Sequence, residues 1–230
     1  MKRCCILLVL GILVALSTQI SSQEKKATPG IVVDKAAGTV TLDVKIAPRV
    51  VLKEKKEPYP LEVIATWPYP KGKKSHETIV NFDESIKPSD VHKALESLGL
   101  NAGKPIKGIG EPQGPAVNVY LLVPDSTGLD RKITLDRAMV DAKNGKPFPK
   151  NVGWRFTGSV MLQLDPNKAD KSYGADNSGT LMSIFPVTDE IVLQTDLTIK
   201  NEGVMKLEVN TKVLPKEGTL VKLVIEIAKK

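Results

Sequence analysis

The residues best suited to chemistry in this 230-residue chain are His76 and His92, its only two histidines. Glu77 follows His76 directly, and imidazole and carboxylate are the groups that general acid–base catalysis and zinc binding share. If the fold brings His92 alongside this pair, the three side chains form a candidate site for a metal-assisted or acid–base enzyme. In the other interpretation each side chain serves its own local structure, and the sequence favours this one.

Local geometry supports the structural interpretation. Ser75, His76 and Glu77 are consecutive on a predicted strand entry, where neighbouring side chains point to opposite faces, so they form no triad among themselves. His92 lies one step off the apolar side of a predicted helix and within reach of Glu96, as in a surface pair. We therefore assign no metal ligands and no cofactor, and leave the catalytic residues unassigned.

A second candidate site is the segment WPYPKGKK, which mixes aromatic rings with lysines. Trp67 and Tyr69 have rings on which a ligand could stack, and Lys73 and Lys74 could contact phosphates or anionic sugars. The same composition is typical of an exposed connection between two strands that lysines keep in solvent. The exposed connection is the favoured interpretation.

The first 22 residues have the three-part layout of a Sec-type secretory signal peptide. A basic start precedes an apolar run from Cys4 to Leu16, which is shorter than the roughly 20 residues that span a bilayer. Cleavage before Thr18 or Gln23 removes both cysteines, so the mature chain can form no disulfide and no thiolate metal site. We expect a secreted or periplasmic protein with no stable membrane insertion after cleavage and no nucleic acid as partner.

The remainder is predicted to be a flexible polar leader over residues 23–30 and a single β-rich domain over residues 31–230. Segments such as GTVTLDVKI alternate apolar and polar residues with the period of a half-buried strand. Turns rich in glycine and proline separate these segments, at a spacing typical of antiparallel hairpins. Strands are therefore expected to dominate the domain.

One helix interrupts this rhythm. Val91, Ala94, Leu95 and Leu98 recur at the spacing that places them on one side of a helix, and Pro88 suits its first turn. The predicted fold class is α+β and strand-dominated, with mostly antiparallel sheet or sheets covered by one main helix from about Pro88 to Leu98.

The segment KSHETIVNFDESIKPSDVHKALESLGLNAGKP resembles the signature of the YdjY-domain family of exported bacterial proteins of unknown function. The pieces VDKAAGTVTLDVKI, WRFTGSVM and SYGADNSGTLMSIF are also similar to that family, over roughly residues 32–193. The resemblance implies a shared fold and carries no catalytic residues with it. Some members are associated with iron–sulfur proteins, and a mature chain without cysteine excludes such a cluster here.

Two functions remain open from the sequence. The first is a non-catalytic binding or structural module whose partner is an envelope protein or a small ligand, and the shortage of catalytic groups favours it. The alternative is the enzyme built on His76, Glu77 and His92. The formal net charge of +7 includes the two basic residues of the signal peptide, and it favours anionic surfaces only weakly.

Overall fold

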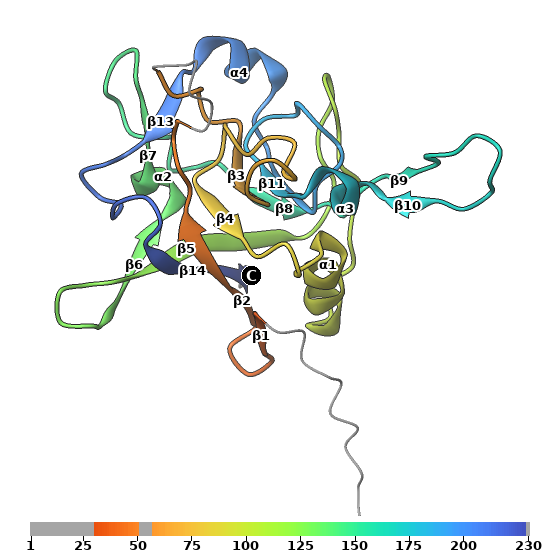
Figure 1. The fold of residues 1–230 in the computed structure, drawn as a ribbon, viewed down its shortest axis with the longest axis horizontal. Helices are drawn as coiled ribbons and strands as arrows, with labels where there is room; N and C mark the ends of the chain where they lie inside the picture. Colours follow the sequence, from red (N-terminus) through yellow and green to blue (C-terminus); the bar gives the residue numbers. More distant parts are fainter. Residues whose placement is uncertain (1–29, 51–56, 229–230) are drawn as a thin grey trace, which may run out of the picture.

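The computed structural model describes residues 30–50 and 57–228, and its centre is a closed ring of eight strands (Figure 1). The predicted signal peptide and the predicted leader up to residue 29 lie outside the described residues. In order around the ring, the strands are β2 (Thr39–Ile46), β14 (Leu220–Ile227), β5 (Ala116–Pro124), β8 (Trp154–Phe156), β12 (Leu193–Thr195), β11 (Thr180–Ser183), β3 (Val63–Thr66) and β4 (Val80–Phe82), which pairs with β2 again.

Shorter elements surround this barrel. A hairpin of β9 (Met161–Leu162) and β10 (Ser172–Tyr173) projects from the body of the molecule (Figure 1). None of the helices in the described part of the chain has the length and apolarity needed to cross a bilayer. The remaining elements are β1 (Ile31–Asp34), β6 (Asp130–Thr134), β7 (Met139–Asp141), β13 (Leu207–Val209), α1 (Pro88–Ser97), α2 (Leu135–Ala138), α3 (Gly174–Ser178) and α4 (Ile199–Val204).

Alternation of side chains builds the barrel core. In β2, Val40 and Leu42 are fully buried, whereas Asp43 and Lys45 are exposed on the opposite face. β8 follows the same rule, because Trp154 is buried and its neighbour is half-buried. Burying an aliphatic or aromatic side chain contributes about 1.5–3 kcal/mol, so the inward residues of the ring determine which face of each strand points inward.

The predicted fold class needs one correction. Strand dominance is confirmed, but the sheet closes on itself, and it mixes six antiparallel pairings with the parallel pairs β11–β12 and β3–β4. No sheet face has to be covered by a helix, because the inward side chains of a closed barrel of this size fill its interior. Alternation looks the same in an open sheet and in a barrel, so the sequence pattern could not distinguish them.

The predicted helix is confirmed almost to the residue as α1. Val91, Ala94 and Leu95 are buried, and Gly99 follows the helix with a φ of +89°. The helix does not lie across a sheet face. It contacts β2 and also Phe156 of β8, which stands three places away in the ring. Strand registers place Phe156 level with the start of β2, so α1 lies at one end of the barrel.

Candidate functional site

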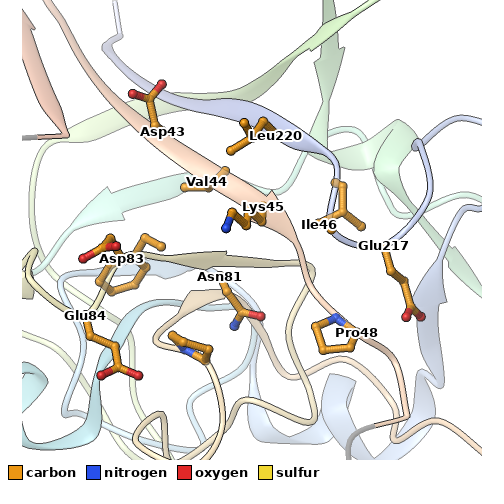
Figure 2. Close-up of a pocket in the computed structure, with 13 residues that line it drawn as sticks. Asp43, Val44, Lys45, Ile46, Pro48, Asn81, Asp83, Glu84, Glu217 and Leu220 are labelled. Carbon is orange, nitrogen blue, oxygen red and sulfur yellow. The ribbon is translucent and has the colours of Figure 1, made fainter.

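A cavity of about 860 Å³ lies on the outer wall of the barrel, at the seam where β2 pairs with β4 (Figure 2). We call it the β2–β4 groove. Its volume is within the range of roughly 300–1,000 Å³ that is usual for ligand sites. Its apolar residues at the surface are Pro48, Pro68 and Leu220, while Val44, Ile46 and Phe82 border it with side chains buried in the core.

The groove forms because β2 changes partner along one edge. β2 pairs with β1 as far as Leu42 and with β4 from Val44 onward, which leaves Asp43 at the gap between the two partners. β4 is three residues long, and the chain then turns away at Asp83. At the other end, Gly218 turns the chain into β14 and its N–H donates to the Ile46 carbonyl at 2.8 Å. Two strand ends and two turns therefore frame the groove.

The charged residues of the groove are mostly acidic, in contrast to the basic chain as a whole. Figure 2 shows Asp43, Asp83 and Glu84 toward one side, Glu217 toward the other, and Lys45 between them. The positive net charge of the chain therefore does not predict the acidic character of this groove.

Each carboxylate of the groove has a different environment. Glu84 pairs with Lys71 at 2.6 Å, and Glu217 accepts a hydrogen bond from the Arg49 backbone N–H at 2.9 Å. Asp83 accepts from the Ser85 N–H at 2.8 Å and from its hydroxyl at 2.6 Å. Asp43 has no ion-pair partner within 4.0 Å in the described part of the chain.

The turn at Asp83 predicts a specific response to acid. Hydrogen bonds from the Ser85 hydroxyl and N–H lower the pKa of Asp83, burial opposes them, and the charge of Lys45 adds to the lowering. A carboxylate whose pKa is lower in the folded than in the unfolded protein stabilises the fold at a pH above its unfolded-state pKa. This stabilisation is lost as the pH falls through the folded-state pKa. We expect the parent's advantage in unfolding free energy over Asp83→Asn to shrink below about pH 4. Urea unfolding of both proteins across this range measures it, and a constant or growing advantage would contradict the assignment.

Glu77, one of the predicted catalytic residues, lies in an ion-pair cluster near the start of β3. Lys74 contacts Glu62 and bonds Glu77 at 2.7 Å. Burial lowers the pKa of Lys74, but its hydrogen bonds to the two carboxylates outweigh burial, and the net pKa is raised. Burial raises the pKa of Glu77, with Lys74 opposing it. Lys74, predicted as a ligand contact, is therefore neutralised within the protein.

His76 lies between two tyrosine rings, Tyr59 from the segment before β3 and Tyr69 from the segment after it. Its ring lies 5.7 Å from that of Tyr59 and 5.3 Å from that of Tyr69, centroid to centroid. The Nδ1 atom of His76 and the hydroxyl of Ser75 are buried and have no hydrogen-bond partner within the described residues. His76 is thus held by ring contacts, and it makes no contact with His92.

The other residues of the WPYPKGKK segment also have partners within the protein. The Trp67 indole N–H donates to the Ile86 carbonyl at 2.9 Å, and Lys73 pairs with Glu190 at 2.8 Å. Tyr69 keeps half of its surface exposed. The segment is therefore a packed connection between β3 and β4 rather than a free basic loop.

His92 is the centre of a separate polar chain at the α1 end of the barrel. Its Nδ1 lies 2.7 Å from the Tyr173 hydroxyl and its Nε2 lies 3.3 Å from Glu96. The predicted contact with Glu96 is confirmed, but the His92 side chain is only 18% exposed, so the pair is not a surface pair. Burial and nearby carboxylates raise the pKa of Tyr173, so the phenol stays protonated while it shares a hydrogen bond with Nδ1. The ring also packs edge-on against Phe156 at 5.0 Å.

Removing the Tyr173 hydroxyl is expected to destabilise the protein modestly. Tyr173→Phe deprives the part-buried Nδ1 of His92 of its hydrogen-bond partner, and a lost hydrogen bond of this kind costs about 0.5–1.5 kcal/mol. Tyr69→Phe is the matched control, because Tyr69 is 51% exposed. Chemical denaturation should show the loss for Tyr173→Phe alone. Equal effects of the two changes would show that the hydroxyl of Tyr173 contributes nothing specific.

The structure does not bring the three predicted catalytic residues together. The Glu77 carbonyl accepts from the N–H groups of Glu62 and Val63, at the beginning of β3. Phe156, against which His92 packs, lies level with the other end of β3, its C-terminal end. Among the described residues, no group of three or more histidine, cysteine, aspartate and glutamate side chains could hold a metal ion.

Sequence reasoning missed the groove and the partner of His92. Asp43 and Lys45 were recognisable as the outward positions of an alternating strand, but nothing local linked them to Asp83 or Glu217. Tyr173 is 81 positions from His92 in the chain, and no spacing signals such a contact.

Comparison with known proteins identifies the family. No curated protein and no solved structure matches the chain. A family model described as the YdjY domain matches residues 31–226, which include all of the barrel but the last residue of β14, α1 and every residue of the groove. The resemblance in the sequence motifs is thereby confirmed, and the chain belongs to the YdjY-domain family.

Proposed function

We propose that this domain is a non-catalytic binding module that works outside the cytoplasm, and that the β2–β4 groove holds its ligand. The observation that carries the proposal is the groove itself, a cavity of about 860 Å³ with an apolar lining and a charged rim. The envelope protein or small ligand expected from the sequence is the occupant that such a surface suits.

The chemistry of the lining supports binding rather than catalysis. The groove is lined by no histidine, cysteine, serine, threonine or tyrosine among the described residues. Carboxylates alone catalyse acid–base reactions when one of them has a raised pKa and holds a proton near neutral pH. In Asp83 the hydrogen bonds from Ser85 lower the pKa, which keeps this carboxylate charged.

A ligand screen with a groove-filling variant tests the proposal. Thermal unfolding of the mature protein would be followed with a library of short peptides, amines and sugar acids, because a ligand that binds the folded state raises Tm. Leu220→Trp places a large ring in the groove, and Leu129→Trp is the matched control on a leucine that is 69% exposed and outside the groove. We expect hits that Leu220→Trp abolishes and Leu129→Trp retains. Hits insensitive to Leu220→Trp would overturn the assignment.

The location outside the cytoplasm rests on the signal-like start of the sequence. We expect the exported protein to begin near Thr18 or Gln23, since small residues precede both positions. Intact-mass spectrometry of material from the envelope or medium checks this. A protein that retains the segment from Met1 to Leu16, or that stays in the cytoplasm, would contradict it.

A further inference from the structure

We infer that the β2–β4 groove receives an extended peptide segment that carries two basic side chains about four residues apart, with uncharged residues between them. The inference rests on the proposed function and names the chemistry of the ligand. Three features of the groove lead to it: an excess of carboxylates at one end, a carboxylate at the other end, and an open middle with exposed proline and leucine side chains.

The first end of the groove has more carboxylates than basic groups in its lining. Asp43 has no ion pair within 4.0 Å among the described residues, although Lys222 stands opposite it in β14. Asp83 accepts hydrogen bonds from the neutral groups of Ser85 and lies in the field of Lys45. Glu84 pairs with Lys71, whose side chain is 62% exposed, and a pair this exposed contributes little and exchanges readily. A cationic side chain placed here gains attraction from several carboxylates without displacing a buried partner.

The second end is defined by Glu217. Because the Gly218 N–H bonds the Ile46 carbonyl, Glu217 lies one residue beyond the end of β2. The distance along β2 from Asp43 to the level of Glu217 is about four residues of extended chain, or roughly 13 Å at a rise of about 3.3 Å per residue. An extended peptide that runs along the seam therefore reaches both acidic ends with basic residues four positions apart.

The middle of the groove selects against a further basic residue in the ligand. Lys45 lies between the two acidic ends, so a third basic residue in the ligand would meet a like charge (Figure 2). The seam also presents Pro48, Pro68 and Leu220, and Leu220 is 62% exposed. Small apolar residues between the two basic ones fit this surface.

The openness of the groove favours a peptide over an enclosed small molecule. Asp43, Lys45 and Leu220 are all exposed, whereas small-molecule sites enclose most of their ligand. A chain segment needs only one side buried, and it gains from side chains at regular spacing along the groove. Anionic polymers are disfavoured because the rim carries four carboxylates and one lysine.

Fluorescence anisotropy with a labelled synthetic peptide tests the inference on the mature protein. The probe is Thr-Lys-Val-Thr-Val-Lys-Thr with blocked ends, in which the lysines are four positions apart. One control peptide has glutamine in place of both lysines, and another, Thr-Val-Lys-Lys-Val-Thr-Thr, keeps the composition with the lysines adjacent. We expect saturable binding of the probe at or below about 1 mM, and weaker binding of both controls.

Protein variants locate the binding. The double change Asp43→Asn with Glu217→Gln is expected to weaken binding about tenfold, because each exposed ion pair contributes up to about 1 kcal/mol. The matched control is Glu111→Gln with Asp170→Asn, two exposed carboxylates outside the groove, and it should leave affinity unchanged. Added salt should weaken binding to the parent more than to the double variant.

The outcomes separate this inference from the proposed function. Failure of the probe to bind, or equal binding of the glutamine or adjacent-lysine peptide, overturns the basic-peptide inference. If the thermal screen still finds a ligand that Leu220→Trp abolishes, the proposed function stands without it. If the screen finds no such ligand either, both are overturned. Binding that depends on the lysines, on their spacing and on the two groove carboxylates supports both.

Discussion

Replacing Phe156 with alanine is expected to lower the free energy of unfolding by about 3–5 kcal/mol. Phe156 is fully buried, lies opposite Leu193 in the pairing of β8 with β12, and carries the ring against which His92 packs. The change removes core packing at the point where the barrel meets α1, and the rigid strands around it leave a cavity. Urea unfolding followed by far-ultraviolet circular dichroism measures the loss.

Met161→Ala is the control for this prediction. Met161 lies five residues further along the chain, where it is 53% exposed, so its truncation should change stability by no more than about 0.5 kcal/mol. A cost below about 1 kcal/mol for Phe156→Ala would mean that this end of the barrel is not packed as described.

Replacing Gly179 with alanine is the second change expected to have a large effect. Gly179 ends α3 at a φ of +67°, and a β-carbon added there would lie 2.5 Å from Cε3 of Trp67. The left-handed conformation costs an alanine about 1–2 kcal/mol, and overpacking against the indole adds about 1–3 kcal/mol. We expect a total loss of about 2–5 kcal/mol by chemical denaturation.

Gly145→Ala separates the two contributions. Gly145 has the same φ of +67°, but an added β-carbon would meet nothing within 4 Å. It should therefore show the backbone cost alone, and the difference between the two variants measures the contact with Trp67. Equal losses would show that Trp67 is free to move aside. A mobile Trp67 would again be a candidate ligand contact. The hydrogen bond from the Trp67 indole to the Ile86 carbonyl argues against such mobility.

Local features of the fold were predictable from the sequence. The end signals of α1 are within a few residues of the helix, and Pro88 and Gly99 delimit it as predicted. The alternation in β2 correctly predicts which side chains are buried, since that depends on neighbours along one strand. Closure of the barrel depends on the pairing of β2 with β4, which joins strands separated by more than thirty residues and leaves no local pattern.

The candidate sites depend even more on contacts between distant residues. The sequence drew attention to His76, Glu77 and Lys74 because they are neighbours, and the structure shows them held by partners that include Tyr59 and Glu62. The groove combines residues near positions 43, 83 and 217, and its acidic character is opposite to the charge of the chain. Charge summed over a sequence describes the whole surface, and a site is a small, selected part of it.

The most direct test of the account is an amide nuclear magnetic resonance map of the mature protein during titration with the best ligand from the thermal screen. Binding in the groove predicts that the largest shift changes occur at Val44, Lys45, Asn81 and Phe82, while the amides of His76 and His92 stay unchanged. Changes centred on His76 or His92, with those four amides unaffected, would contradict the central claim that this domain binds its ligand at the seam of β2 and β4.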